Sequence, residues 1–387
     1  MRRPLRLALP VGAVALSAAL GGTALAAEPP APGVKVTHAA PGQGVDGQYI
    51  VTLKPGVSVG STVSRTKVRT LHRYGKALNG FAARLTSAQL ARLRTTPGVA
   101  AIEQDGVVRA SETQSNPPSW GLDRIDQARL PLSSSYTYNS RGAGVNAYVI
   151  DTGIAASHSD FGGRASNVYD ALGGNGNDCN GHGTHVAGTV GGARHGVAKS
   201  VNLRGVRVLD CNGSGSWSQV IAGMDWVARN HVKPAVANLS LGGGYSSSVN
   251  AAADRLANAG VSVAVAAGNE NTNACNRSPA SAANVITVAA STRTDAKASY
   301  SNYGSCVELY APGSAITSTW LNGGTNTING TSMASPHVAG VAALYKATNG
   351  DASYGTIRSW IVSRASSGVI TGNPSGTPNL LLNTGGL

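Results

Sequence analysis

Four residues that could carry out chemistry lie at separate places in the chain, each within two residues of a glycine. They are Asp151, His182, Asn269 and Ser332. A serine hydroxyl becomes a nucleophile when an imidazole takes its proton and a carboxylate orients that imidazole, as acyl transfer requires. An amide side chain and the backbone N–H of the serine can stabilise the tetrahedral oxyanion that forms next. Taken singly, Ser332 also fits an ordinary helix N-cap, and Asn269 an ordinary turn residue.

The residues between these positions predict the elements that hold them. Apolar runs predict buried strands at 145–150, 201–208, 235–241, 261–266 and 285–289. Small-residue and one-faced apolar patterns predict helices at 182–192, 216–229 and 333–345. Alternating strands and helices indicate an α/β fold with a mostly parallel sheet and helices on both faces. Such sheets bind ligands beyond the carboxyl ends of their strands, where Asp151 and Asn269 fall.

The beginning of the chain predicts export. A basic start, an apolar run from Leu5 to Leu20 and the small-residue stretch Ala24-Leu25-Ala26 are the three parts of a secretory signal peptide, which we assign to residues 1–26. The apolar run is short, which argues against a permanent membrane anchor. We therefore expect a secreted, extracellular protein. Arg2-Arg3 does not decide between the general and the twin-arginine export routes.

Residues 27–110 indicate a separate front domain. A spacer rich in Pro, Ala and Gly precedes a module over about 48–109, with strands expected at 49–53, 80–85 and 99–108 and helices at 61–71 and from 86 onward. This split β-α-β pattern predicts a small α+β, ferredoxin-like domain. The polar segment 111–118 then predicts a linker and a processing boundary, so that the main domain spans 111–387.

The positive charge of the chain is concentrated in this front part. The whole chain carries a formal net charge of +13, of which residues 1–110 contribute +10 and residues 111–387 only +3. Once the front part is removed, the remaining protein is nearly balanced. A nucleic-acid-binding function is therefore not expected.

Four cysteines lie beyond the front domain, at Cys179, Cys211, Cys275 and Cys306. An even number of cysteines in an exported protein predicts disulfides. Three pairings remain possible from the sequence alone.

Three further stretches give the chain a resemblance to a known family. Together with the order Asp, His, Asn and Ser, the stretches Trp120–Gln127, Asp178–His182 and Val206–Gly215 resemble the subtilisin-like serine proteases, and most closely the proteinase K family and its aqualysin-like bacterial branch. The resemblance covers Gln114 to Gly386. It implies the subtilisin-like three-layer fold, and the front module is similar to the inhibitory propeptides of the same family.

The resemblance assigns a role to each candidate residue. It implies a catalytic triad of Asp151, His182 and Ser332, with Asn269 in the oxyanion hole. It also implies the disulfide pairs Cys179–Cys211 and Cys275–Cys306.

Three segments are expected to bind substrate. Gly213-Ser214-Gly215 and Ser240-Leu241-Gly242 resemble the two segments that pair with an extended peptide through their main chains. Ser240-Leu241-Gly242 and Ala266-Ala267-Gly268 are expected to line the primary specificity pocket. The pocket walls in these stretches are small and apolar and carry no charge. We therefore expect broad specificity for apolar or aromatic residues before the scissile bond.

The resemblance also implies structural calcium and no catalytic cofactor. The main calcium site of the family maps to two carbonyls and a carboxylate, those of Ala283, Val285 and Glu308. Proteinase K has the shorter Asp at this carboxylate position. A second site, found in relatives of this branch, maps to Asp123, Asp126 and Gln127. Acids at this spacing also fit a solvated helix face or a cap.

Together these features predict a secreted serine endopeptidase made as a self-processing zymogen. We expect the precursor to be cut near residues 105–113, and the propeptide then to block the substrate cleft until it is degraded. The expected partners are protein or peptide substrates and this propeptide, and the mature enzyme is expected to be a monomer. An esterase of the α/β-hydrolase type would instead use G-x-S-x-G and the order Ser, acid, His. A binding protein on a decayed protease scaffold is harder to exclude by spacing.

Overall fold

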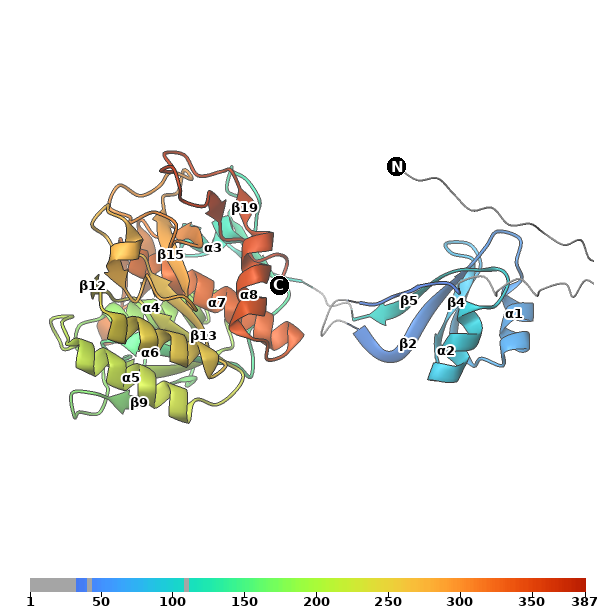
Figure 1. Cartoon of the computed structure of the whole chain (residues 1–387), viewed down its shortest axis with the longest axis horizontal. Helices are drawn as coiled ribbons and strands as arrows, with labels where there is room; N and C mark the ends of the chain where they lie inside the picture. The colour runs from blue at the N-terminus through green and yellow to red at the C-terminus, as the bar shows by residue number, and fades with distance from the viewer. Residues whose placement is uncertain (1–32, 40–43, 108–110) are drawn as a thin grey trace, which may run out of the picture. The chain divides into compact units, whose positions relative to one another are not determined.

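The computed structural model describes residues 33–39, 44–107 and 111–387, which form the two compact units in Figure 1. One unit consists mainly of Gly47–Gln104 and the other mainly of Asp105–Leu387. The predicted signal peptide lies outside the described residues. So does the segment 108–110 that precedes the predicted linker.

The smaller unit is a five-stranded sheet with two helices. The strand order is β1-β5-β2-β4-β3, and β4 pairs antiparallel with both β2 and β3. The elements are β1 Val36–Thr37, β2 Gly44–Leu53, α1 Val59–Thr66, β3 Thr70–Tyr74, β4 Gly80–Arg84, α2 Ser87–Arg94 and β5 Val99–Gly106. Val51, Phe81 and Leu93 form a dry core between sheet and helices. This is the small α+β arrangement predicted for the front module.

The helix predicted at 61–71 is shorter than expected. It ends at Thr66 because Lys67 adopts a left-handed backbone conformation, with φ of 54°. Thr70–Tyr74 then forms β3 at the edge of the sheet. This strand is largely exposed, so it lacks the alternating apolar pattern that would have revealed it.

The larger unit is built on a nine-stranded sheet with the order β19-β20-β16-β15-β13-β11-β8-β10-β9. Neighbouring strands run parallel except for the pair β19 and β20. The strands are β8 Asn146–Asp151, β9 Ala165–Asp170, β10 Asn202–Arg207, β11 Ala235–Leu239, β13 Ser262–Ala266, β15 Ile286–Ser291, β16 Leu309–Pro312, β19 Ser366–Ser367 and β20 Leu380–Leu381. All five strands predicted from apolar runs are present, with ends shifted by one or two residues.

Helices cover both faces of this sheet, which confirms the predicted three-layer fold (Figure 1). Val149 of β8 packs in the core that contains residues of α4 and α7, whereas Ile150 packs in the core that contains residues of α5 and α6. The alternation follows from the period of two along a strand. The helices are α3 Trp120–Ile125, α4 His182–Gly191, α5 Trp217–Asn230, α6 Ser247–Asn258, α7 Thr331–Asn349 and α8 Tyr354–Arg364.

The sequence predicted a linker at 111–118, but the structure has a β-strand in this segment. Within it, β6 Glu112–Ser115 pairs antiparallel with β7 Ser135–Tyr138. Two cations hold this strand: Arg141 is paired with Glu112, and Lys199 Nζ donates to Gln114 Oε1 at 2.7 Å. These partners lie 29 and 85 residues away in the chain, so local composition could not reveal the strand.

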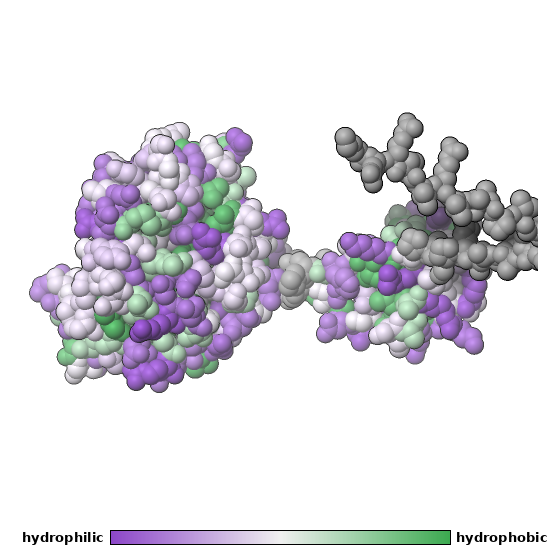
Figure 2. All heavy atoms as spheres, in the orientation of Figure 1, coloured by the Kyte–Doolittle hydropathy of each residue, from purple (hydrophilic) through white to green (hydrophobic). Residues whose placement is uncertain are grey.

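Two disulfides join Cys179 to Cys211 and Cys275 to Cys306, the pairs that the resemblance implied. On the face of the larger unit seen in Figure 2, hydrophobic residues are scattered among hydrophilic ones and form no extended patch. Among the residues that the structure describes, no helix has both the length and the apolar character needed to cross a bilayer.

Candidate active site

Three neighbouring strands end at the predicted site. In the order β13-β11-β8, these strands lead directly into the segments that contain Asn269, Ser240 and Asp151. The strands are parallel, so their carboxyl ends meet at one edge of the sheet. Helix α7, which begins at Thr331, packs against β11, β13 and β15 and brings Ser332 to the same edge.

Asp151 and His182 form a close pair at this edge. Asp151 Oδ1 lies 2.7 Å from His182 Nδ1, and the Asp151 side chain is completely buried. Asp151 Oδ1 also accepts a hydrogen bond from the Thr152 N–H. Burial opposes protonation of the imidazole, but the negative charge of Asp151 and its hydrogen bond outweigh burial, so the pKa of His182 is raised above its ordinary value. The histidine is therefore suited to accept a proton at its other nitrogen, Nε2.

A glycine fixes the approach to His182. Gly181 has φ of +105°, and a Cβ built there would lie 2.5 Å from the Trp320 ring. Only glycine fits both this backbone conformation and this contact. The histidine can therefore be the first residue of α4, next to Asp151.

Ser332 is the second residue of α7, and two hydrogen bonds join it to Ser240. The Ser332 Oγ donates to the Ser240 carbonyl at 3.1 Å, and the Ser240 Oγ donates to the Ser332 carbonyl at 2.7 Å. The Ser332 hydroxyl thus points to the backbone of a predicted substrate-binding segment. In this rotamer the hydroxyl proton is donated to Ser240, so the Ser332 side chain would have to turn about its Cα–Cβ bond before it could donate to His182.

Asn269 is held so that its amide nitrogen is free to donate. Its Oδ1 accepts from the Thr331 N–H at 2.8 Å and from the Thr331 hydroxyl at 3.0 Å. A Cβ built on Gly330 would lie 3.6 Å from the Ser332 nitrogen and 3.7 Å from Asn269 Nδ2. Two N–H donors therefore border one small space that glycine leaves open at the start of α7. An oxyanion in this space would meet both donors and the positive end of the helix.

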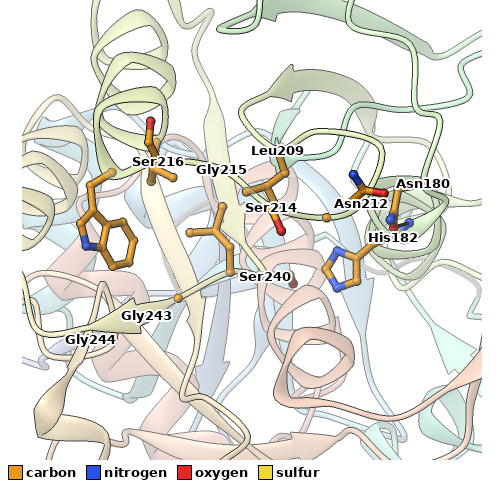
Figure 3. Close-up of a pocket in the computed structure, with 15 residues that line it drawn as sticks. Asn180, His182, Leu209, Asn212, Ser214, Gly215, Ser216, Ser240, Gly243 and Gly244 are labelled. Atoms are coloured by element: carbon orange, nitrogen blue, oxygen red, sulfur yellow. Dashed lines mark hydrogen bonds between the residues drawn. The ribbon is translucent and has the colours of Figure 1, made fainter.

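A groove of about 810 Å³ runs past His182 and contains the predicted main-chain binding segments (Figure 3). In this view the His182 ring projects into the groove beside Ser214 and Asn212. All six residues predicted for these segments line it, namely Gly213, Ser214, Gly215, Ser240, Leu241 and Gly242. Trp217 also lines the groove and was not predicted; its ring lies against Gly243, which has no side chain to obstruct it.

A smaller pocket of about 80 Å³ opens next to Ser332. The predicted wall residues Ala266, Ala267 and Gly268 line it, together with Leu241, Gly242 and Asn269. The predicted stretches carry no charge, but two charged residues that were not predicted, Glu270 and Arg277, also line this pocket. Their side chains form an ion pair at 3.3 Å and are 46% and 28% exposed, respectively. The pair leaves the pocket neutral overall but gives it two opposite charges.

The second expected calcium site has one feature that fits a bound cation. Burial, and then the negative charge of Asp123, raise the pKa of Asp126 to about 6 against the effect of a backbone hydrogen bond. Asp126 Oδ1 is buried and has no hydrogen-bond partner among the described residues. Asp123 Oδ1 and the Gln127 amide oxygen both accept from the Ser133 N–H, whereas Asp126 Oδ2 accepts from the Thr137 N–H. These donors are uncharged backbone groups, so no cation from the described part of the chain competes with an ion at these oxygens.

The main expected calcium site does not fit a calcium ion. Val285 O accepts a hydrogen bond from the Tyr354 hydroxyl at 2.7 Å. Glu308 Oε2 accepts from the Thr287 N–H at 2.7 Å, and Oε1 accepts from the Arg358 guanidinium at 3.1 Å. Both oxygens of the carboxylate and one of the two carbonyls are therefore engaged by donors of the protein, and one of these donors, Arg358, already supplies the positive charge that an ion would bring.

The parallel sheet, the Asp–His pair at its strand ends and the serine at a helix start define the class of protein, a serine hydrolase. The Subtilase family matches residues 142–384, and the Peptidase inhibitor I9 family matches residues 48–111. The first match spans more than half of the chain, so the chain belongs to the subtilase family. This membership confirms the predicted family and excludes the esterase alternative.

Individual relatives agree with this assignment. The chain is 53% identical over 344 residues to the extracellular serine proteinase of Thermus sp. (strain Rt41A), covering 86% of this chain and 84% of that protein. It is 44% identical over 382 residues to Proteinase R of Parengyodontium album, covering 95% and 98%. A solved cold adapted subtilisin-like serine proteinase matches with a TM-score of 0.68 and 52% identity, covering 70% of this chain and 99% of that one. The protein is an extracellular serine proteinase of the proteinase K and aqualysin type, as predicted.

The hydrogen bonds of Asn269 allow its two functions to be separated. An Asn269→Asp variant keeps the oxygen that accepts from Thr331 but replaces the donating amide with an acceptor. We expect kcat to fall by at least about 10²–10³-fold, the range known for loss of one such donor in subtilisin, because the carboxylate also places a negative charge beside the oxyanion. KM should change by less than about threefold. Steady-state kinetics on a peptide substrate measures both constants. An unchanged kcat would show that the Asn269 amide does not face the oxyanion.

Proposed function

We propose that the protein hydrolyses peptide bonds through an acyl-enzyme on Ser332, with Asp151, His182 and Asn269 in the roles that the sequence predicts. The observation that supports this most strongly is the 2.7 Å contact between Asp151 and the Nδ1 atom of His182, whose ring projects into the groove. A buried carboxylate in this position selects the tautomer with the proton on Nδ1. The Nε2 atom is then left with the lone pair that a general base needs.

The reaction follows from these positions. Ser332 Oγ attacks the carbonyl carbon of the scissile bond while His182 Nε2 takes the hydroxyl proton. The Ser332 N–H and Asn269 Nδ2 donate to the resulting oxyanion. The C–N bond then breaks, and His182 gives its proton to the leaving amine. Water hydrolyses the acyl-enzyme by the same steps in reverse, while Asp151 stabilises the charged imidazole throughout.

We propose that the residue before the scissile bond is apolar or aromatic. Three alanines support this preference: Ala266, Ala267 and Ala280 line the small pocket and are each at most 5% exposed. A charged substrate side chain would lose its hydration there without a net opposite charge to receive it, since Glu270 is paired with Arg277. The main chain of the substrate would pair with the two segments that line the groove.

We also propose that the chain is made as a zymogen and acts as a monomer. The proposed boundaries are a signal peptide at 1–26, a propeptide at 27–110 and the peptidase domain at 111–387. The I9 match over residues 48–111 and the compact fold of the smaller unit support a propeptide that inhibits its own enzyme. Cleavage near residues 105–113 would release the chain close to the start of β6, whose contacts with Arg141 and Lys199 belong to the larger unit.

A structural calcium ion is proposed at Asp123, Asp126 and Gln127. The buried, unpartnered Asp126 Oδ1 supports it, because calcium prefers carboxylate and amide oxygens and would satisfy that atom. The ion would hold the loop from 126 to 134 against α3. No step of the reaction uses it.

Self-processing tests the catalytic role of Ser332. In Ser332→Ala the nucleophile is absent while every other contact of the fold remains. We expect this variant to be secreted as an uncut precursor, whereas the wild type appears as the mature domain. Mass spectrometry of the secreted protein measures both. Normal processing of Ser332→Ala would contradict the mechanism, and adding a trace of wild-type enzyme controls for a precursor that cannot be cut at all.

The ion pair in the small pocket predicts a change of specificity. Arg277→Gln leaves Glu270 without its cation, so the pocket gains a net negative charge. We expect the ratio of kcat/KM for Lys relative to Phe before the scissile bond to rise about 3- to 10-fold, as expected for a partly exposed charge pair. Arg255→Gln, at an exposed position on α6, is the matched control. A ratio that is unchanged in Arg277→Gln would show that Glu270 does not reach the bound side chain.

A further inference from the structure

Helix α8 presents two hydrogen-bond donors to two of the residues expected to hold the main calcium ion. The Tyr354 hydroxyl donates to Val285 O at 2.7 Å, and Arg358 Nη2 and Nε donate to Glu308 Oε1 at 3.1 and 3.3 Å. Tyr354 and Arg358 are four residues apart in one helix and therefore share a face. The two interactions are thus made by one turn of α8 on adjoining parts of the large sheet.

The carboxylate of Glu308 needs a positive partner at this position. Its side chain is only 12% exposed, and its two oxygens accept hydrogen bonds from the Thr287 N–H and from Arg358. A buried carboxylate remains charged at low cost only when a cation and hydrogen-bond donors meet it. Arg358 supplies that cation from within the chain.

Calcium would need the same oxygens. Calcium takes six to eight oxygen ligands at about 2.3–2.6 Å. A guanidinium already bound to one of these oxygens would repel it, because both are cations. Unlike a bound calcium ion, Arg358 cannot be removed by a chelator. The donors around Glu308 and Val285 therefore perform the task for which the resemblance implied a metal.

We propose that Arg358 and Tyr354 replace the structural calcium ion at Glu308 and Val285, so that their hydrogen bonds and ion pair hold α8 against the sheet without a metal. The contribution to stability should be large for this helix, because only Ile357 and Ile361 of its eleven residues are buried. Calcium dependence of the whole enzyme would then arise elsewhere, as at Asp126.

Stability measurements test whether the Arg358–Glu308 pair holds α8 in place. In the Ser332→Ala background, which prevents self-digestion, we expect Arg358→Gln to lower Tm by roughly 3–6 °C, and by the same amount in calcium and in EDTA. Arg364→Gln, at an exposed position on the same helix, is the control and should leave Tm within about 1 °C. An unchanged Tm in Arg358→Gln, or a loss seen only in EDTA, would overturn the proposal.

Calcium counting tests the replacement of the metal directly. The calcium bound per chain is measured by atomic emission after equilibrium dialysis against calcium, in the same background. We expect Glu308→Gln to bind as much calcium as its parent. A loss of one ion per chain in Glu308→Gln would overturn the proposal, because it would place calcium at this carboxylate. Neither readout depends on catalysis, so their failure would leave the proposed peptidase mechanism untouched.

Discussion

The buried contact between Asp151 and His182 is the interaction on which the rest of the site depends. A carboxylate with no exposed surface is costly unless it is compensated, and one of its oxygens, Oδ2, has no hydrogen-bond partner among the described residues. The compensation comes mainly through Oδ1, from His182 and the Thr152 N–H. Loss of this contact would leave the Asp151 carboxylate buried without its partner. The interaction that orients the His182 imidazole therefore also holds the imidazole in place.

Ser332 is positioned differently, by the N-terminus of α7. Thr331 is bound by Asn269, and Gly330 leaves open the space that both N–H donors border. One donor, the Ser332 N–H, belongs to a long helix whose residues are nearly all buried from Thr331 to Lys346, and the other, the Asn269 amide, is held against this helix by Thr331. The oxyanion would thus be stabilised by groups that the packed core has already fixed, which is the condition for electrostatic preorganisation.

The sequence predicted the parts of the structure that depend on local pattern. Continuous apolar runs revealed the central strands, because both faces of a covered parallel sheet are buried. The strand Thr70–Tyr74 was missed because it is largely exposed and lacks an alternating apolar pattern, and the strand Glu112–Ser115 was missed because its partners are distant in the chain. The order of Asp151, His182, Asn269 and Ser332 was enough to predict which residues gather, but not how the Ser332 hydroxyl points.

Two arginines near the site were not predicted from the sequence, and the physical reason is the same for both. Arg277 follows the pocket stretch by several residues and returns to it through the fold, so its charge was not visible in the pocket segments themselves. Arg358 lies 50 residues from Glu308, and only the packing of α8 brings the two together. A carboxylate in a sequence predicts that a cation will be near it, but it does not say whether the cation is a metal or an arginine.

The most direct test of the account is the pH dependence of Ser332 labelling by a fluorophosphonate in the mature enzyme. The account predicts one adduct, on Ser332, that forms faster as pH rises, because His182 accepts the serine proton only when neutral. The midpoint should lie above about 6.5, the ordinary value for histidine, since the pKa of His182 is raised. Asp151→Asn should slow labelling by orders of magnitude and move the midpoint to lower pH. No adduct, an adduct on another serine, or a midpoint unaffected by Asp151→Asn would contradict it.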